Sequence, residues 1–170
     1  FYSLVGGSGL SRDFLFRVTN LSVGGQGIDN VGLYARTAAY PGRNIEDKPI
    51  SYGGVEFHMG GRAIYEGAEG YPIEFYCDSS YAVRGALEAA SRGTFDNEPT
   101  GAGFNVDPLG TITLQPMGRG GALFMEAFCV LVGASIRSIG PIEYLIADGT
   151  GEVAKFTCTF AYQSYTIATT

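Results

Sequence analysis

The sequence predicts a mainly β fold, an antiparallel β-barrel or a two-sheet sandwich, with one flanking α-helix and one long loop. The 170 residues include 26 glycines, 11 tyrosines and 11 phenylalanines; aromatic residues favour strands and glycine favours tight turns. The apolar runs are short and glycine separates them, as is typical of strands joined by turns. The length suits one core, so residues 1–170 are predicted to form a single domain.

Strand patterns begin near the N-terminus. Residues 12–19 alternate apolar and polar side chains, residues 22–29 are rich in turn formers, and residues 30–37 are predicted to be the returning strand. Residues 61–68 and 71–77 have the pattern of two further strands on either side of a glycine-marked turn.

The C-terminal half predicts a meander of strands. It follows a polar loop at residues 94–110. The strands expected after this loop, each separated from the next by glycine, are residues 111–117, 122–136, 141–148 and 152–167. The last of them shows the clearest alternation in the chain.

One helix is predicted, at about residues 79–92. Three side chains at its start can accept hydrogen bonds from free backbone N–H groups: Asp78, Ser79 and Ser80. An apolar stripe recurs at helical spacing: Val83, Leu87 and Ala90. Arg84 and Glu88 form an i, i+4 pair, and Gly93 stands where a glycine commonly ends a helix. We expect this helix to cover one open side of the sheet structure.

The three cysteines are Cys77, Cys129 and Cys158. Each lies in an apolar or alternating run, and no pair has the CxxC spacing of a redox or zinc site. We expect buried free thiols in a protein of a reducing compartment.

Groups that would make an enzyme are scarce. His58 is the only histidine, and the cysteines lie in strands instead of at a helix N-terminus, where a thiolate is activated. The glycine clusters at 6–9 and 24–27 lack the GK[ST] that a phosphate loop requires. Three carboxylates of the polar loop lack the spacing of a calcium loop: Asp96, Glu98 and Asp107. We therefore predict no enzyme, no catalytic residue, no metal and no cofactor.

The charge and hydropathy exclude two further classes. A net charge of −6 argues against tight nucleic-acid binding, which needs clustered Lys and Arg. No apolar run reaches the roughly 18 residues that a membrane span requires. Charged residues make up only 16% of the chain, which suggests that something other than water covers part of its surface.

Residues 38–61 are predicted to form a long loop, because two prolines and five glycines interrupt them. The same segment carries apolar side chains that a free loop would expose, among them Tyr52, Val55, Phe57 and Met59. One interpretation is an Ω-loop packed on its own core. The other is an arm that buries these side chains against a neighbouring copy of the chain.

The segment AYPGRNIEDKPISYGG, from residue 39, resembles the region where tail tube proteins of contractile-tailed bacteriophages carry an LPGR-x-I motif before a long loop. The following residues, GGRAIYEGAEGYPIEFYCDSSYAVRGALEAA, continue the resemblance with strands, an Asp and a helix with an Arg near its start. Asp78 and Arg84 stand in that order here. The resemblance covers most of residues 12–165, and Tyr40 stands where the motif has Leu.

The resemblance implies a structural virion protein. Six copies would join edge to edge into a ring, and rings would stack into the inner tube of the tail, through which phage DNA passes without specific binding. The implied partners are the tail sheath protein, the baseplate initiator and the tail terminator. The implied location is the virion tail, assembled in the cytoplasm of the host bacterium. An acidic chain lining such a channel would repel phosphates.

Alternatives remain at this point: a tube-initiator ring at the baseplate, a tube protein of a phage-derived injection system, or a monomeric ligand-binding β-barrel. For the tube, the predicted subunit interface consists of Pro41, Gly42, Arg43, Ile45, Lys48, Ile50, Tyr52, Val55, Phe57, His58 and Met59.

Overall fold

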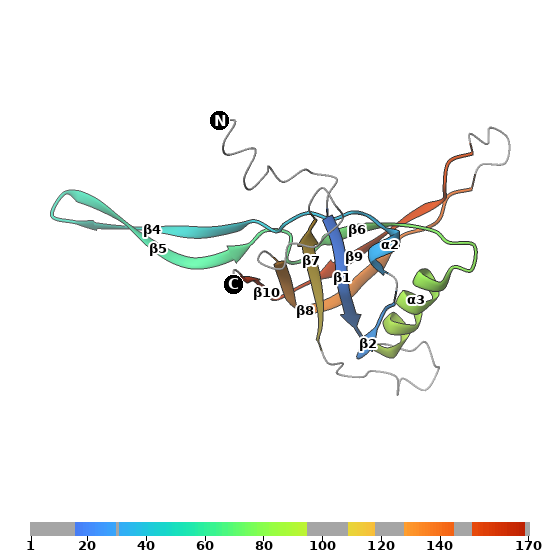
Figure 1. The fold of residues 1–170 in the computed structure, drawn as a ribbon. Coiled ribbons are helices and arrows are strands. Elements are labelled where there is room, and N and C mark those ends of the chain that lie inside the picture. Colours follow the sequence, from blue (N-terminus) through green and yellow to red (C-terminus); the bar gives the residue numbers. More distant parts are fainter. Residues whose placement is uncertain (1–15, 30, 95–108, 118–127, 145–150, 169–170) are drawn as a thin grey trace.

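The computed structural model describes residues 16–29, 31–94, 109–117, 128–144 and 151–168. These residues form an antiparallel sheet in the strand order β2-β1-β7-β8-β9-β6-β3, with β10 also paired to β8 (Figure 1). The bounds are β1 Phe16–Val23, β2 Gln26–Gly27, β3 Ala35–Thr37, β6 Tyr71–Tyr76, β7 Gly110–Pro116, β8 Phe128–Ile139, β9 Lys155–Ala161 and β10 Ser164–Ala168. A separate hairpin consists of β4 Arg43–Tyr52 and β5 Val55–Tyr65, and the helices are α2 Val31–Tyr34 and α3 Ala82–Thr94. The predicted mainly β fold is confirmed.

The long strand β8 joins two halves of the sheet. Residues 128–134 of β8 pair with β7 and β10, whereas residues 135–139 pair with β9. We call β1, β7, β10 and residues 128–134 of β8, with β2 at the edge, the β1 sheet. We call β3, β6, β9 and residues 135–139 of β8 the β6 sheet. The two curve around a shared core as a half-barrel.

Alternate residues of both sheets fill the core, and α3 closes its open side. Leu21, Ile112, Leu131, Phe75 and Phe160 are among the fully buried side chains. The predicted helical stripe of Val83, Leu87 and Ala90 belongs to the same cluster. The predicted cover helix is therefore confirmed.

Arg84 ties α3 to the sheet. Its Nε donates to Glu88 at 3.0 Å, as the i, i+4 spacing predicts, and its Nη1 donates to the carbonyl of Gly140 at 2.8 Å. The guanidinium also lies 5.4 Å from the centre of the Phe156 ring. A cation placed over the face of a core ring adds attraction that an exposed ion pair alone does not supply.

Several predicted elements differ in their bounds. Residues 30–37 are not a returning strand: residues 31–34 form α2, and β3 pairs with β6 at the far end of the sheet. The expected strand at 141–148 is absent over residues 141–144. The expected strand at 152–167 is two strands, because the chain bends at residues 162–163 to follow β8. Residues 12–15, 95–108, 122–127 and 145–148 lie outside the described residues.

The helix begins and ends later than the sequence predicts. Tyr81 has a φ of 53°, which is not helical, so the first helical residue is Ala82. Asp78 still caps the helix, because its Oδ1 accepts the N–H of Ala82 at 3.1 Å. Gly93 lies inside α3, which ends at Thr94.

Loss of the Asp78 cap should weaken the fold in a pH-dependent way. The Ser80 hydroxyl and the Ala82 N–H both donate to the carboxylate and lower the pKa of Asp78 below its ordinary value. A folded pKa below the unfolded one stabilises the fold above the unfolded pKa, and the contribution is lost as pH falls through the folded pKa. Asp78→Ala should therefore lower Tm at pH 7, and by less at pH 3. Ser79→Ala is the control, and an equal Tm loss at both pH values would contradict the assignment.

The three cysteines are free thiols, as predicted. Burial raises the pKa of Cys129 to about 11 and that of Cys158 to about 12, and it also raises the pKa of the half-buried Cys77. Since the thiolate is the reactive form, a disulfide-exchange reagent at pH 8 should label the native protein slowly. Denaturant should make all three thiols react fast, and fast labelling of all three in the native protein would contradict the burial of Cys129 and Cys158 in the core.

No described helix is long and apolar enough to cross a membrane.

Candidate assembly surface

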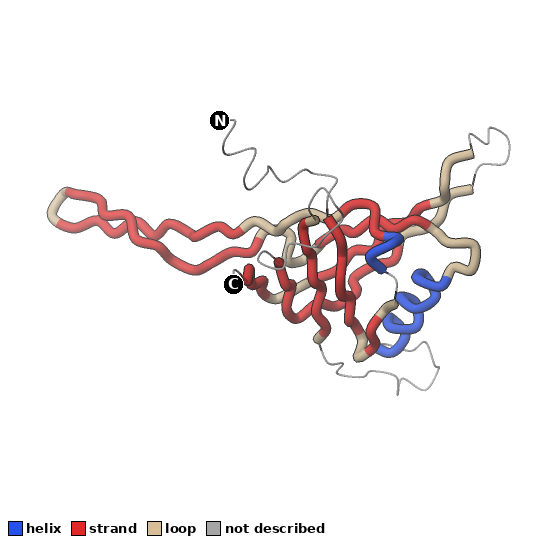
Figure 2. The backbone as a smooth tube through the Cα atoms, viewed as in Figure 1, coloured by secondary structure: helices blue, strands red, loops and turns tan. Residues whose placement is uncertain are grey.

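The hairpin formed by β4 and β5, residues 43–65, stands away from the rest of the molecule (Figures 1 and 2). We call it the arm, and the other described elements the body. The two strands pair with each other along nearly their whole length, and they form a sheet separate from that of the body. All but two residues of the arm, Glu46 and Tyr65, are exposed. The arm is therefore built by its own ladder and not by packing on the body.

The predicted long loop is thus wrong as a description of residues 43–61, which are regular strand apart from the two-residue turn. Gly53 and Gly54 form this turn with φ values of 61° and 81°. A tight hairpin turn with positive φ at both central residues favours Gly-Gly. The same two glycines were interpreted as an interruption of the strand pattern, although Gly-Gly between extended residues is itself a hairpin signal.

The register divides the arm into two chemically different faces. Directly paired residues of an antiparallel hairpin share a face, and successive pairs alternate. The pairs Tyr52–Val55, Ile50–Phe57 and Lys48–Met59 therefore stand on one face, which we call the apolar face. The pairs Ser51–Glu56, Pro49–His58 and Asp47–Gly60 stand on the other, which we call the polar face. The close contact between His58 Nδ1 and Asp47 Oδ2, at 2.6 Å, lies on the polar face.

The apolar face has no cover among the described residues. Tyr52 is 79% exposed, Phe57 is 52% exposed, and Ile50, Val55 and Met59 are each at least half exposed. Five large apolar side chains on one face of a two-stranded ribbon form a contiguous surface of the kind that marks an interaction site. A two-stranded hairpin alone in water is also only marginally stable, so a partner on this face would complete the structure.

The base of the arm is fixed to the body by tyrosines. The Tyr162 hydroxyl donates to the carbonyl of Glu66 at 2.6 Å, and the Tyr65 ring meets the Tyr165 ring edge-on at 5.5 Å. On the other strand, the Tyr71 hydroxyl donates to the carbonyl of Ala39 and accepts the N–H of the same residue at 3.2 Å. These contacts set the direction in which the arm leaves the body.

The predicted interface residues fall into three groups. Lys48, Ile50, Tyr52, Val55, Phe57 and Met59 come together on the apolar face. Ile45 and His58 lie on the polar face because of their register. Pro41, Gly42 and Arg43 lie at the base, where the carbonyl of Gly42 accepts the N–H of Glu66 at 3.1 Å. Arg43 and Lys48 are exposed and form no ion pair within the described part of the chain.

The base also contains residues that the sequence reasoning missed. The four tyrosines that hold it come from two distant parts of the chain, Tyr65 and Tyr71 from one and Tyr162 and Tyr165 from the other. The sequence around each of them is typical of ordinary core residues. Ile64 is 41% exposed on the same side of the arm as the apolar face, but lies beyond a β-bulge between Ile45 and Asp47. A bulge changes which face of the arm the following residues occupy, so the sequence alone does not indicate the face on which Ile64 lies.

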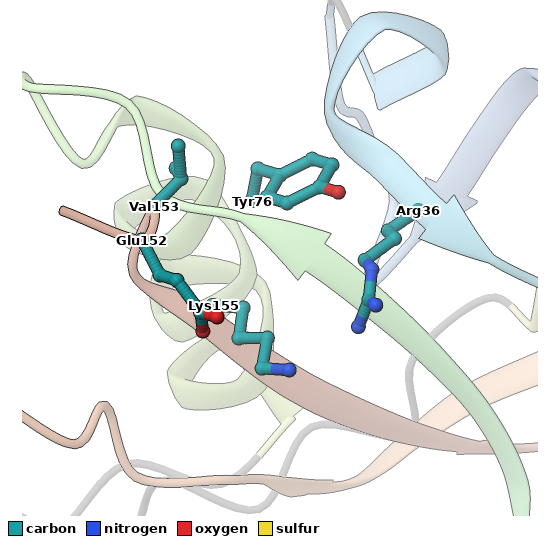
Figure 3. Close-up of a pocket in the computed structure, with 5 residues that line it drawn as sticks. All are labelled: Arg36, Tyr76, Glu152, Val153 and Lys155. Atoms are coloured by element: carbon teal, nitrogen blue, oxygen red, sulfur yellow. The ribbon is translucent and has the colours of Figure 1, made fainter. Parts of the chain in front are cut away.

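A pocket of about 380 Å³ lies on the body and is lined by Arg36, Tyr76, Glu152, Val153 and Lys155 (Figure 3). Its two cations are engaged by one carboxylate: Arg36 Nη1 lies 2.6 Å and Lys155 Nζ 3.6 Å from Glu74. The hydrogen bond and charge of Glu74 raise the pKa of Arg36. This cluster links β3, β6 and β9, and the pocket lining holds no histidine or thiol that would act as a nucleophile or base.

No protein-family model matches the chain, and no curated protein matches it significantly. Solved structures do. A chain of the sheath–tube complex of the extracellular contractile injection system PVC, in the extended state, superposes with a TM-score of 0.66 at 10% identity, over 100% of this chain and 99% of that one. The chain has the fold of these contractile-system proteins.

Two further structures agree. A chain of the PVC sheath/tube terminator gives a TM-score of 0.62 at 13% identity, over 95% of this chain and 98% of that one. A chain of the baseplate of the anti-feeding prophage, AFP, gives a TM-score of 0.61 at 11% identity, over 96% of this chain and 97% of that one. The resemblance inferred from the sequence is confirmed at the level of the fold.

Proposed function

We propose that this chain is a structural tube subunit of a contractile tail or contractile injection machine. It assembles with copies of itself into rings, and the rings stack into a tube. The observation that carries the proposal is the arm: a hairpin with an uncovered apolar face on a body whose fold matches chains of sheath–tube, terminator and baseplate complexes. Its role is assembly, and no catalytic step is part of it.

Burial of the apolar face against a neighbouring copy gives a large driving force. Five side chains that are each at least half exposed would contribute on the order of 1 kcal/mol apiece when covered. The gross gain of roughly 5 kcal/mol per arm recurs at every subunit of a ring, and it offsets the loss of rotational and translational freedom on association. Six of the interface residues predicted from the sequence supply this contact: Lys48, Ile50, Tyr52, Val55, Phe57 and Met59. Arg43, at the base of the arm, is available to pair with an acidic neighbour.

The sheet edges support a second contact between copies. Among the described residues β10 pairs only with β8, so its other edge is open. Ile167 stands on the core-facing side, opposite the buried Cys129, yet it is 55% exposed because no strand lies beyond it. An open edge is a template for a strand of another chain. The outer edge of β1 is already occupied at Leu21, Ser22 and Val23, because the N–H of Ile28 donates to the first and β2 pairs with the other two.

The finer assignments belong to the same proposal. A ring of six copies, a sheath around the tube, an initiator at the baseplate and a terminator at the far end are the arrangement that we infer. The AFP baseplate structure was six-fold symmetrised, and the PVC structures contain sheath–tube and sheath/tube terminator complexes. In a phage tail the tube would conduct the genome within the virion; an injection-machine tube is the alternative from the same class. A single initiator ring is the second candidate, favoured by the similarity to a baseplate chain.

Electron microscopy of the purified chain at increasing concentration tests the proposal. Long hollow tubes support a tube subunit, single rings that do not stack support the initiator, and six-fold top views support the ring size. Limited proteolysis gives an independent readout, since the arm should be cut in the monomer and protected in the assembly. A monomer at every concentration whose arm resists protease would overturn the proposal in favour of a monomeric ligand-binding barrel.

A further inference from the structure

The face of the β1 sheet that points away from the core has an unusual composition. In the register of the four strands, Leu21, Ile112, Leu131 and Tyr165 form a row that faces the core. The residues on either side of this row must therefore face outward. One outward row is Ser22, Thr111, Val132 and Ser164, and the other is Asn20, Thr113, Val130 and Thr166. We call these eight residues the hydroxyl face.

The hydroxyl face carries no charge. Five of its eight side chains are Ser or Thr, one is Asn and two are Val. The acidic residues that the structure describes stand elsewhere: on the arm and its base, on β6, at or near α3 and α2, and in the segments that flank β9. Two opposite charges border the face at its β1 edge: Arg17 stands on the same outward side, paired with Gln115, and it lines a small pocket with Asp29 and Asn20. None of the acidic side chains that give the chain its net charge of −6 is therefore among the eight residues of this face.

The position of the hydroxyl face within a ring follows from the difference in bulk between the two sides of the β1 sheet. The opposite face of the same sheet carries the core, the β6 sheet and α3. If copies stand side by side around an axis, the bulky side has room only on the outside of the ring. This step rests on the proposed function, because a chain that makes no ring has no inside.

We infer that the hydroxyl face lines the bore and that the bore wall is uncharged, so that the tube does not repel a polyanion through its wall. Hydroxyl groups hold water by neutral hydrogen bonds, whereas a wall with clustered carboxylates would focus a negative potential of several kT into the channel. This differs from the acidic bore that the composition alone suggests. The conduit accepts hydrated cargo without selecting the sign of its charge.

A single cysteine on this face can report both its position and its potential. Val132→Cys is conservative in size and places a thiol in the middle of an outward row, at a side chain that is 39% exposed. The background variant is Cys77→Ser, since Cys129 and Cys158 are buried. Ala89→Cys on the exposed side of α3 is the matched site on the bulky side of the body.

The first measurement is labelling by a thiol reagent attached to a protein-sized polymer, on monomer and on tubes verified by electron microscopy. Val132→Cys should lose its labelling on assembly, and Ala89→Cys should keep more of it. Equal labelling of Val132→Cys in monomer and tube would overturn the placement. Absence of tubes for the unmodified chain would be a failure of the proposed function, and it is seen before any label is added.

The second measurement compares small cationic and anionic thiosulfonates on assembled Val132→Cys tubes. The ratio of their rates should lie within about threefold of the ratio for a free thiol, because an uncharged wall adds little potential. Adding Thr111→Glu, directly opposite position 132, should shift the ratio toward the cation and so calibrate the sensitivity. A preference for the cation of about tenfold or more without that acid would overturn the neutral wall.

Discussion

Phe57→Asp should abolish tube formation while leaving the body folded. Phe57 lies in the middle of the apolar face, paired with Ile50, and is 52% exposed in the isolated chain. A carboxylate at this position would have to be desolvated in the contact between copies, which costs several kcal/mol when no partner charge is present. Tyr52→Asp should act in the same way, since Tyr52 is the most exposed of the large apolar side chains of this face. Sedimentation and electron microscopy measure assembly, and thermal unfolding measures the fold.

A pair of variants with the same added charge separates the faces of the arm. Phe57→Lys puts a cation on the apolar face, whereas Ser51→Lys puts one on the polar face, opposite Glu56. We expect the first to block tubes and the second to permit them, with the same Tm for both. Tubes from Phe57→Asp and Phe57→Lys would show that the apolar face carries no assembly contact. Loss of tubes in Ser51→Lys as well would mean that both faces are buried.

Gly110→Ala should have the largest effect on the stability of the body. A Cβ at this position would lie 1.7 Å from the carbonyl oxygen of Ser22 and 2.8 Å from Cα of Val23. Both atoms belong to the backbone of β1, so no side chain can rotate to relieve the clash, and β1 must separate from β7. We expect a loss of about 3 kcal/mol or more in the free energy of unfolding. For a domain of this length that lowers Tm by roughly 6–12 °C.

Gly27→Ala is the matched control for this substitution. Gly27 also lies in a short strand beside β1, and a Cβ there has no atom within 4 Å. Its effect on the free energy of unfolding should stay within about 0.5 kcal/mol. If the two variants unfold at the same temperature, the close approach of β7 to β1 is not as the structure gives it.

The sequence predicted what local patterns determine. The stripe of Val83, Leu87 and Ala90 repeats at helical spacing, so α3 and its buried side could be predicted without knowledge of its neighbours. The alternation within residues 152–167 likewise predicted a strand, and its apolar members Phe156, Cys158 and Phe160 are buried in the core. In each case the repeat spacing of apolar residues within a single helix or strand is enough for the prediction.

What the sequence did not predict depends on pairing. The faces of the arm follow from the register of β4 on β5, and that register is set by a two-glycine turn and a bulge. The sequence shows the turn only as glycines that interrupt a strand pattern, and it does not show the bulge. The position of β3 beside β6 depends on a contact across 38 residues, from Arg36 to Glu74. Neutrality of the hydroxyl face arises only when four strands, distant in the chain, are placed in register, so no window of sequence displays it.

The tyrosine contacts at the base of the arm have a consequence for the speed of growth. Because Tyr71, Tyr162 and Tyr165 fix where the arm leaves the body, a free subunit already presents its contact surface in a set direction. Less conformational freedom is then lost when it reaches the end of a growing polymer. The rate of elongation would be limited by the diffusional encounter of subunits with the end of the tube, and not by a slow rearrangement after binding. Nucleation, in which no template exists, would be the slow step that a cell can regulate.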